Sequence, residues 1–245
     1  NRLMNEFGKI EKGWRGSWRR AYLDECESEA TQIMILLNLH LYSAVYFRAV
    51  THEKLVDAVF DLLDTGVELD HSVLHAKAPA MGTPFPMHQD WPFYAHKDPN
   101  GFVDALLHID STNETNGCLK LVPGSHKLGP LQHIIERDKD DKINEPYLSP
   151  ADYPIDQAIA IPAKAGDVVL MSYLTVHGSS PNRTNHWRRM VRIGYRDPQN
   201  KVLFPDDPYW KGPSFRFGEH RRIQPLGMIL RGQRKNDQQF TSETA

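Results

Sequence analysis

Two polar side chains lie one residue apart in the stretch PFPMHQDWPFY, residues 84–94, which is otherwise rich in proline and aromatic residues. His88 and Asp90 occupy positions i and i+2, and side chains with this spacing project from the same face of an extended strand. A strand can therefore direct an imidazole and a carboxylate at one point, and both groups are ligands for divalent metal ions.

A third candidate ligand is His177, at the end of the apolar run GDVVLMSYLTV, residues 166–176. It follows Asp90 by 177 − 90 = 87 residues, and neighbouring strands of a barrel join positions this far apart. If the strands meet, two imidazoles and one carboxylate hold one face of a metal and leave the other face open. Non-haem Fe(II) oxygenases use this ligand set, but a zinc hydrolase could use it too.

Arg188 favours the oxygenase. It follows His177 by 188 − 177 = 11 residues, across a turn rich in glycine, proline and asparagine, and it begins the strand-like run RRMVRIGY, residues 188–195. A guanidinium in the mouth of a barrel is costly unless an anion pairs with it. Its planar fork matches a carboxylate, so a dicarboxylate co-substrate is the expected partner. The alternative, without the triad, is that Arg188 lies on the surface, as Arg189 or Arg192 could.

The motifs MHQDWPFY, NGCLKLVPGSHKLGP, PAKAGDVVLMSYLTVHGSSPNRTNHWRR and RIGYRDP occur in this order between residues 67 and 198. Together they resemble the phytanoyl-CoA dioxygenase family of Fe(II)- and 2-oxoglutarate-dependent oxygenases. The resemblance implies a mainly β fold with flanking helices and a double-stranded β-helix (jelly-roll, cupin-like) core. It also implies Fe(II), 2-oxoglutarate and O₂ as cofactor and co-substrates, with release of succinate and CO₂.

The resemblance implies roles for individual residues: iron ligation by His88, Asp90 and His177, and anchoring of 2-oxoglutarate by Arg188. Ser179 matches a family position near the co-substrate carboxylate, although a turn serine that bonds locally is an equal alternative. In halogenases of the family a small residue replaces the carboxylate ligand. Because Asp90 is present, hydroxylation of an unactivated C–H bond in a small molecule is the expected reaction.

Neighbouring residues carry weaker expectations. Leu106 stands where some relatives have a tryptophan against 2-oxoglutarate, so the pocket departs from the family there. Gln89 should point away from the iron and have a structural role, whereas Trp91, Phe93 and Tyr94 fit either a cavity wall or aromatic core packing. Five further residues read as ordinary half-buried polar side chains: His71, His75, His96, His108 and Lys77.

Two other functions stay open on the residues alone. A zinc hydrolase that binds an anionic substrate through Arg188 predicts turnover without oxygen. A non-catalytic, cupin-like protein that binds a small carboxylate predicts no succinate with any substrate.

The composition is that of one globular domain of 245 residues, with 40% hydrophobic and 24% charged residues. A net charge of −2 without long single-sign blocks predicts neither a nucleic-acid partner nor a membrane surface. Two cysteines, Cys26 and Cys118, indicate a reducing, cytoplasmic setting rather than a disulfide framework. No apolar segment approaches the roughly 18 residues of a membrane helix. The sequence gives no prediction of the oligomeric state.

Three regions are expected within the single oxygenase domain. Residues 1–66 read as a mostly helical support layer, with a packing helix that starts at a Thr51 N-cap. Residues 67–198 contain short strand-like runs separated by turn residues and form the jelly-roll core. Within them, a charged loop over 133–156 is expected to determine specificity. Residues 199–245 are a C-terminal extension expected to pack on the barrel.

Overall fold

The computed structural model describes residues 2–3, 5, 33–80, 82–93, 96–134, 146–203 and 227–234. The strands are β1 (Ile33–Leu37), β2 (Val67–Lys77), β3 (Phe85–His88), β4 (Phe102–His108), β5 (Leu119–Leu121), β6 (Ile159–Ile161), β7 (Val168–Ser172), β8 (His177–Ser179), β9 (Arg188–Arg196) and β10 (Met228–Arg231). The helices are α2 (Ala44–Val50) and α3 (Glu53–Leu63), and the short 3₁₀ turns are η1 (Leu39–Leu41), η2 (Trp91–Phe93), η3 (Ser125–Leu128) and η4 (Ile155–Gln157).

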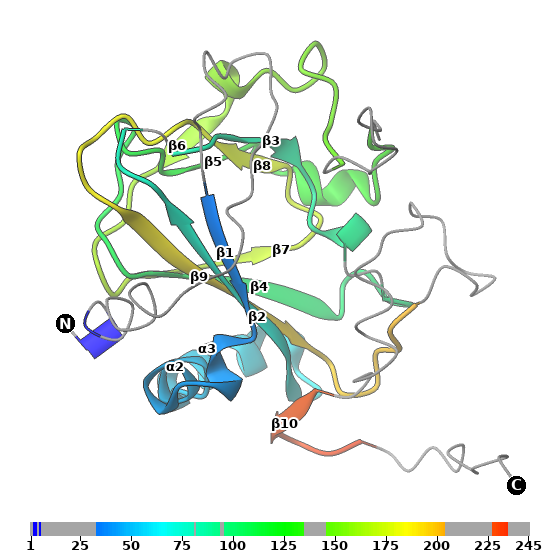
Figure 1. Ribbon diagram of the computed structural model, residues 1–245. Helices are drawn as coiled ribbons and strands as arrows, with labels where there is room; N and C mark the ends of the chain where they lie inside the picture. The colour runs from blue at the N-terminus through cyan, green and yellow to red at the C-terminus, as the bar shows by residue number, and fades with distance from the viewer. Residues whose placement is uncertain are drawn as a thin grey trace, which may run out of the picture.

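The described strands form two antiparallel sheets that face each other (Figure 1). The larger sheet has the order β1-β2-β9-β4-β7, with β10 also paired to β2, and the smaller has the order β3-β8-β5-β6. Two facing antiparallel sheets with long crossovers between them are a jelly roll. The predicted fold class is therefore confirmed.

The long strands of the larger sheet are buried on both faces, and alternation gives each face a different character. On the outer face, Leu74, Ala105 and Val191 belong to the main hydrophobic core beneath the helices. On the inner face, residues such as Leu106 and Met190 point between the two sheets, where polar side chains are mixed with apolar ones. The inner face of this sheet therefore forms one wall of the site.

Helices α2 and α3 cover the outer face of the larger sheet (Figure 1). In α3 the buried side chains are Leu55, Val56 and Val59, which repeat at helical spacing and pack on the sheet. The N-cap of α3 is His52 rather than the predicted Thr51, whose hydroxyl instead donates to the last turn of α2. No helix among the described residues is long and apolar enough to cross a lipid bilayer.

The smaller sheet brings distant segments of the chain into register. β3 and β8 are antiparallel neighbours, with His88 paired to His177. Gly178 lies between the strands where space is tight, because a Cβ there would come 2.8 Å from the carbonyl oxygen of Phe85 and 2.9 Å from Sδ of Met87. The pairing that joins the two histidines therefore depends on this glycine.

The N-terminal region departs from the helical expectation. Residues 33–37 form β1, which pairs with the 73–77 part of β2, so the prediction of helix for this segment is wrong. The expected helical segment over 6–32 lies outside the described residues, and the division into three regions stays a prediction. In the C-terminal extension, β10 pairs with β2 at the edge of the larger sheet, as the packing hypothesis expected.

Candidate active site

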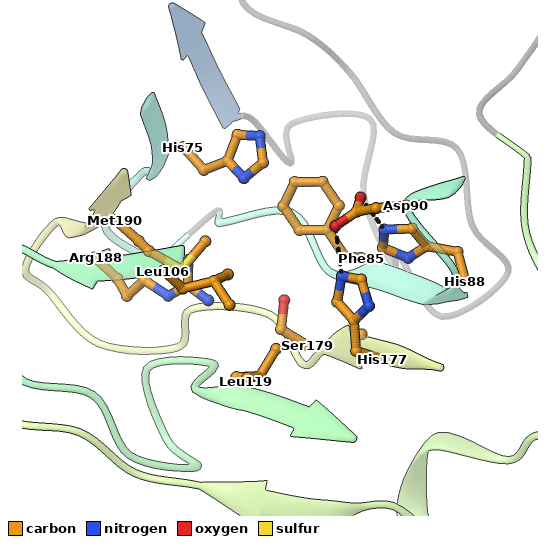
Figure 2. A pocket seen from close by; sticks show the side chains of 11 residues that line it. His75, Phe85, His88, Asp90, Leu106, Leu119, His177, Ser179, Arg188 and Met190 are labelled. Atoms are coloured by element: carbon orange, nitrogen blue, oxygen red, sulfur yellow. Dashed lines mark ion pairs between the residues drawn. The ribbon is translucent and has the colours of Figure 1, made fainter. Parts of the chain in front are cut away.

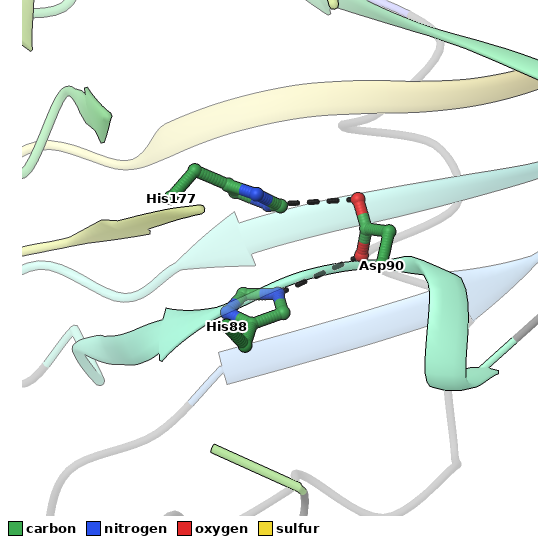
Figure 3. A group of neighbouring side chains, drawn as sticks. All are labelled: His88, Asp90 and His177. Atoms are coloured by element: carbon green, nitrogen blue, oxygen red, sulfur yellow. Dashed lines mark ion pairs between the residues drawn. The ribbon is translucent and has the colours of Figure 1, made fainter. Parts of the chain in front are cut away.

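The two histidines and the aspartate of the predicted triad lie together between the sheets (Figure 3). His88 is the last residue of β3, His177 is the first residue of β8, and Asp90 follows just beyond β3. Nε2 of His88 lies 3.6 Å from Oδ1 of Asp90, and Nε2 of His177 lies 3.5 Å from Oδ2. One ligand atom from each residue falls within 4.8 Å of the others, and all three residues are buried. The site thus has the compactness that a single metal ion requires.

Backbone carbonyls fix which ring nitrogen of each histidine is free. Nδ1 of His88 donates to the carbonyl oxygen of Pro86 at 2.7 Å, and Nδ1 of His177 donates to that of Thr175 at 2.9 Å. A nitrogen that donates to a carbonyl carries the proton, so in the neutral ring Nε2 keeps its lone pair. Both Nε2 lone pairs therefore face the carboxylate of Asp90, as metal-ligating histidines require.

Electrostatics favour the charge state that binds a metal. Burial alone would raise the pKa of Asp90, but the guanidinium of Arg192 and the two imidazoles hold it well below its usual range. Burial lowers the pKa of His177 to about 4, and the neighbouring His88 adds to the shift. At neutral pH the site therefore contains an ionised carboxylate and a neutral His177 imidazole, the forms that coordinate cations.

Arg188 begins β9 and is buried, with 2% of its surface exposed. Its Nε and Nη2 donate to the carbonyl oxygen of Gly117 at 3.1 and 2.8 Å. Its Nη1 is buried and has no hydrogen-bond partner among the described residues. Burial lowers its pKa to about 10, so the group is still charged at neutral pH. A buried cation with an unsatisfied donor is a site for an anion.

Gly117 is placed by a backbone conformation that other residues rarely adopt. Its φ is +76°, and a Cβ there would come 2.2 Å from the carbonyl oxygen of Ser180. The turn needs glycine, and this turn presents the carbonyl that orients Arg188.

Ser179 and Lys77 complete the polar end of the site. Ser179 lines the same cavity as Arg188. Nζ of Lys77 donates to Oγ of Ser179 at 2.7 Å and to the carbonyl oxygen of Ser180 at 2.6 Å. Lys77 is fully buried and stands opposite Arg188 in the β2–β9 register, so its interpretation as an ordinary half-buried residue is wrong.

One cavity of about 40 Å³ connects the triad to Arg188 (Figure 2). Its walls between these two ends are largely apolar and include Phe85, Leu106, Leu119 and Met190. Leu106 thus lies at the predicted position in the pocket. The cavity is cationic at one end and bears the candidate metal-ligand cluster at the other.

Two functional residues escaped the sequence analysis. Arg192 is buried, not on the surface, and its Nε lies 2.9 Å from Oδ2 of Asp90 and 2.9 Å from Oδ1 of Asp104. Asp104, in β4, is fully buried. The signal was present in the strand period, because residues 188, 190 and 192 share one face of a strand. Arg189 faces the other way and pairs with Asp110.

The remaining predictions near the triad have mixed outcomes. Gln89 is structural, as expected, because its side chain bonds to the carbonyls of Gly129 and Leu174. Trp91 packs in a hydrophobic cluster, which supports core packing. Phe93 places its ring edge-on to His88. Tyr94 lies outside the described residues.

Five further residues were expected to be half-buried polar side chains. Four of them are buried, namely His71, His96, His108 and Lys77, and the fifth, His75, lines the cavity.

Comparison with known proteins agrees with this geometry. A family model described as phytanoyl-CoA dioxygenase (PhyH) matches residues 7–190. The probable alpha-ketoglutarate-dependent hypophosphite dioxygenase of Stutzerimonas stutzeri is 32% identical over 208 residues, covering 79% of this chain and 69% of that protein. The peroxisomal phytanoyl-CoA dioxygenase of Rattus norvegicus is 32% identical over 137 residues, covering 54% of this chain and 40% of that protein. The chain thus spans less than half of the rat enzyme.

Solved structures share the fold. The non-heme alpha ketoglutarate dependent carbocyclase SnoK is 20% identical, with a TM-score of 0.66 and coverage of 95% of this chain and 86% of that one. EctD from S. alaskensis, solved with 2-oxoglutarate and 5-hydroxyectoine, is also 20% identical, with a TM-score of 0.65 and coverage of 95% and 78%.

Fold, site and relatives together define a non-haem oxygenase that depends on Fe(II) and 2-oxoglutarate. Within that class, the chain belongs to the phytanoyl-CoA dioxygenase family. The predicted enzyme class and its cofactors are therefore confirmed.

Proposed function

We propose that the chain hydroxylates a C–H bond of a small molecule, with His88, Asp90 and His177 as Fe(II) ligands and Arg188 as the anchor of 2-oxoglutarate. The observation that carries the proposal is a cavity lined both by the triad and by Arg188, whose Nη1 has no hydrogen-bond partner among the described residues. A metal site alone fits several chemistries. A metal site joined by one small cavity to a buried cation fits a short, metal-chelating diacid.

The triad fits the metal by the chemistry of its donors. Two Nε2 lone pairs and an ionised carboxylate converge, and each is fixed by its own hydrogen bonds or ion pairs. This set, with three positions left for other ligands, is typical of non-haem Fe(II). Held by His88, Asp90 and His177, Fe(II) would supply the activation of O₂ that couples decarboxylation of 2-oxoglutarate to oxidation of the substrate.

The protein's part in the reaction is to bind, orient and exclude water. Arg188 would receive the distal carboxylate of 2-oxoglutarate through Nη1, while its other edge is held by Gly117. Lys77 keeps the hydroxyl of Ser179 at the same end of the cavity. Apolar walls between the two ends keep the co-substrate in one orientation and leave little room for water.

The segment over 133–156 is the proposed determinant of substrate specificity, because two of its residues, His133 and Leu148, are tied to the residues on either side of His88. Nε2 of His133 accepts from the backbone nitrogen of Gln89 at 2.9 Å. The backbone nitrogen of Leu148 donates to the carbonyl oxygen of Met87 at 2.8 Å. Residues 135–145, between these ties, lie outside the described part of the chain. Relatives named for hypophosphite and for phytanoyl-CoA indicate that small-molecule substrates differ widely around this core.

The setting is proposed to be reducing and cytoplasmic. Among the described residues, which do not include Cys26, the buried thiol of Cys118 forms no disulfide, which supports this proposal.

A screen for succinate release tests the function and finds the substrate. The protein would be supplied with Fe(II), 2-oxoglutarate and O₂ and offered small metabolites and acyl-CoAs. We expect one substrate class to give succinate in proportion to hydroxylated product, with no turnover without O₂ and none in Asp90→Ala. Turnover under anaerobic conditions would support a hydrolase instead. Absence of succinate with every substrate, despite 2-oxoglutarate binding, would support a binding protein.

A further inference from the structure

Arg192 lies on the inner face of β9, on the same side of the strand as Arg188 and Met190. It has 3% of its surface exposed and pairs with Leu106 in the β4–β9 register. A buried guanidinium needs compensating anions, so the contacts of Arg192 determine what it is for.

Two carboxylates share the Nε of Arg192. Oδ2 of Asp90 and Oδ1 of Asp104 each lie 2.9 Å from it. Asp104 is fully buried in β4, in register with Gly194 of β9. Asp104 and Asp90 thus meet at the same nitrogen of the guanidinium, so that Arg192 links Asp104 to the triad.

Arg192 approaches Asp90 most closely at Oδ2. Oδ2 lies 2.9 Å from Nε of Arg192 and 3.5 Å from Nε2 of His177, and Oδ1 lies 3.6 Å from Nε2 of His88. A carboxylate that is free to rotate loses orientational entropy when it binds a metal. An ion pair to the carboxylate restricts that rotation before a metal binds.

Arg196 provides an internal comparison. It lies four residues further along the same face of β9, is equally buried and pairs with Glu68 and Asp70. No ion pair joins Arg196 to the triad among the described residues. The two arginines therefore share strand, face and burial, and differ in whether the paired carboxylate belongs to the metal site.

We propose that Arg192 is a positioning residue that orients the carboxylate of Asp90 for metal binding, and that Asp104 holds Arg192 in place. The proposal rests on the metal-site assignment given under the proposed function. It assigns to Arg192 and Asp104 a role in the affinity and geometry of the metal site, and none in contact with the co-substrate.

Metal titration without turnover tests the proposal. Co(II) would be titrated into the metal-free protein and followed by its ligand-field absorption, with wild type, Arg192→Gln, Arg192→Lys and Asp104→Asn. Removing a group that orients a metal ligand weakens metal affinity by about 10- to 100-fold. We expect a loss in this range for Arg192→Gln, a smaller loss for Asp104→Asn and partial rescue in Arg192→Lys, with altered absorption in all three variants.

Arg196→Gln is the matched control. Removing one partner of a buried ion pair destabilises the fold, so this variant should melt at a lower temperature, yet its Co(II) affinity should equal that of wild type. The proposal is overturned if the Arg192 and Asp104 variants bind Co(II) with wild-type affinity and absorption, or if Arg196→Gln loses as much affinity as they do. If Arg192→Gln does not fold, Arg192→Lys and Asp104→Asn decide by the same criteria.

The titration also separates this proposal from the proposed function. If wild type binds no Co(II), or if Asp90→Ala binds it as well as wild type, the metal site itself is wrongly assigned. If wild type binds, Asp90→Ala does not and the Arg192 and Asp104 variants match wild type, only the positioning role fails.

Discussion

The carbonyl oxygen of Gly117 accepts two hydrogen bonds from Arg188, at 3.1 Å from Nε and 2.8 Å from Nη2. These bonds occupy one edge of the guanidinium and leave Nη1 without a partner among the described residues. A turn between β4 and β5 thereby orients a side chain of β9, and the cation is set before any anion binds. Such preorganisation reduces the cost of binding a charged ligand.

Replacing Arg188 should weaken the binding of 2-oxoglutarate far more than it weakens the binding of the metal. Truncating one partner of a buried charge pair costs about 2–5 kcal/mol, so Arg188→Gln should raise the KM for 2-oxoglutarate on the order of 100-fold. Arg189→Gln is the control, because Arg189 pairs with Asp110 on the other face of the strand. Steady-state succinate formation against 2-oxoglutarate concentration measures both. Equal KM values in the two variants would refute the role of Arg188 as the anchor of 2-oxoglutarate.

Gly117→Ala should disturb the orientation of Arg188 without replacing that side chain. The new Cβ would lie 2.2 Å from the carbonyl oxygen of Ser180, so the turn must shift and take the Gly117 carbonyl with it. Gly124→Ala is a close control, since Gly124 has nearly the same φ, +77°, but a Cβ there meets nothing within 4 Å. We expect weaker 2-oxoglutarate binding in the first variant only, measured by calorimetry with Co(II) bound. Identical affinities would show that the carbonyl does not orient Arg188.

The metal-free protein should lose stability in mild acid, and His108 should contribute. Burial, aided by the positive charge of Arg188, lowers the pKa of His108 to about 4, and neither ring nitrogen has a hydrogen-bond partner among the described residues. Between pH 6.5 and 4 the unfolded chain therefore binds a proton that the folded chain does not, so stability falls as pH falls through this window.

His108→Leu should flatten that dependence. The difference in free energy of unfolding between this variant and wild type should shift in favour of the variant by about 1–2 kcal/mol from pH 7.5 to pH 5. Urea unfolding in the presence of a chelator measures this difference. The exposed His126 offers a control, and His126→Gln should leave the profile unchanged. A wild-type profile in His108→Leu would contradict the assigned pKa direction.

Tyr195→Phe should loosen the helices from the larger sheet. The Tyr195 hydroxyl donates to the carbonyl oxygen of Val50 at 2.5 Å, where α2 ends, and both residues are fully buried. Loss of the bond leaves a buried carbonyl unsatisfied and should cost about 1–2 kcal/mol, which lowers Tm by about 2–8 °C. Thermal unfolding followed by circular dichroism measures the shift. Tyr42→Phe, at a residue 81% exposed, should not change Tm.

Spacing along the sequence and the family resemblance together predicted the three residues that the structure brings into one cluster. The i, i+2 spacing suggested that His88 and Asp90 lie side by side, which they do although Asp90 lies just beyond β3, and the spacing from His177 to Arg188 fitted a return along the next strand. The same rule puts Arg192, two residues beyond Met190, on the face of the strand that carries Arg188. A charged residue in a run of arginines is nevertheless usually interpreted as solvent-exposed. Only the partners of Arg192, which come from β4 and from the loop after β3, make its burial tolerable, and register between distant strands is not visible in one sequence.

Strand β1 is a case in which the sequence-based expectation, a helix, was wrong. Ile33–Leu37 is a short apolar run with neither alternation nor helical spacing, and such runs are ambiguous between strand and helix. Its strand conformation follows from the exposed edge of β2, where it pairs from Leu37 to Ile33 against Val73–Lys77. Tertiary pairing thus decided what local propensity left open.

The most direct measurement is an anaerobic titration of the protein with Fe(II) and 2-oxoglutarate, followed by the visible charge-transfer band of the chelate. The band should appear in wild type, vanish in Asp90→Ala and require far more 2-oxoglutarate in Arg188→Gln. No band in wild type, or an undiminished band in both variants, would contradict the assignment of the triad and its arginine to Fe(II) and 2-oxoglutarate.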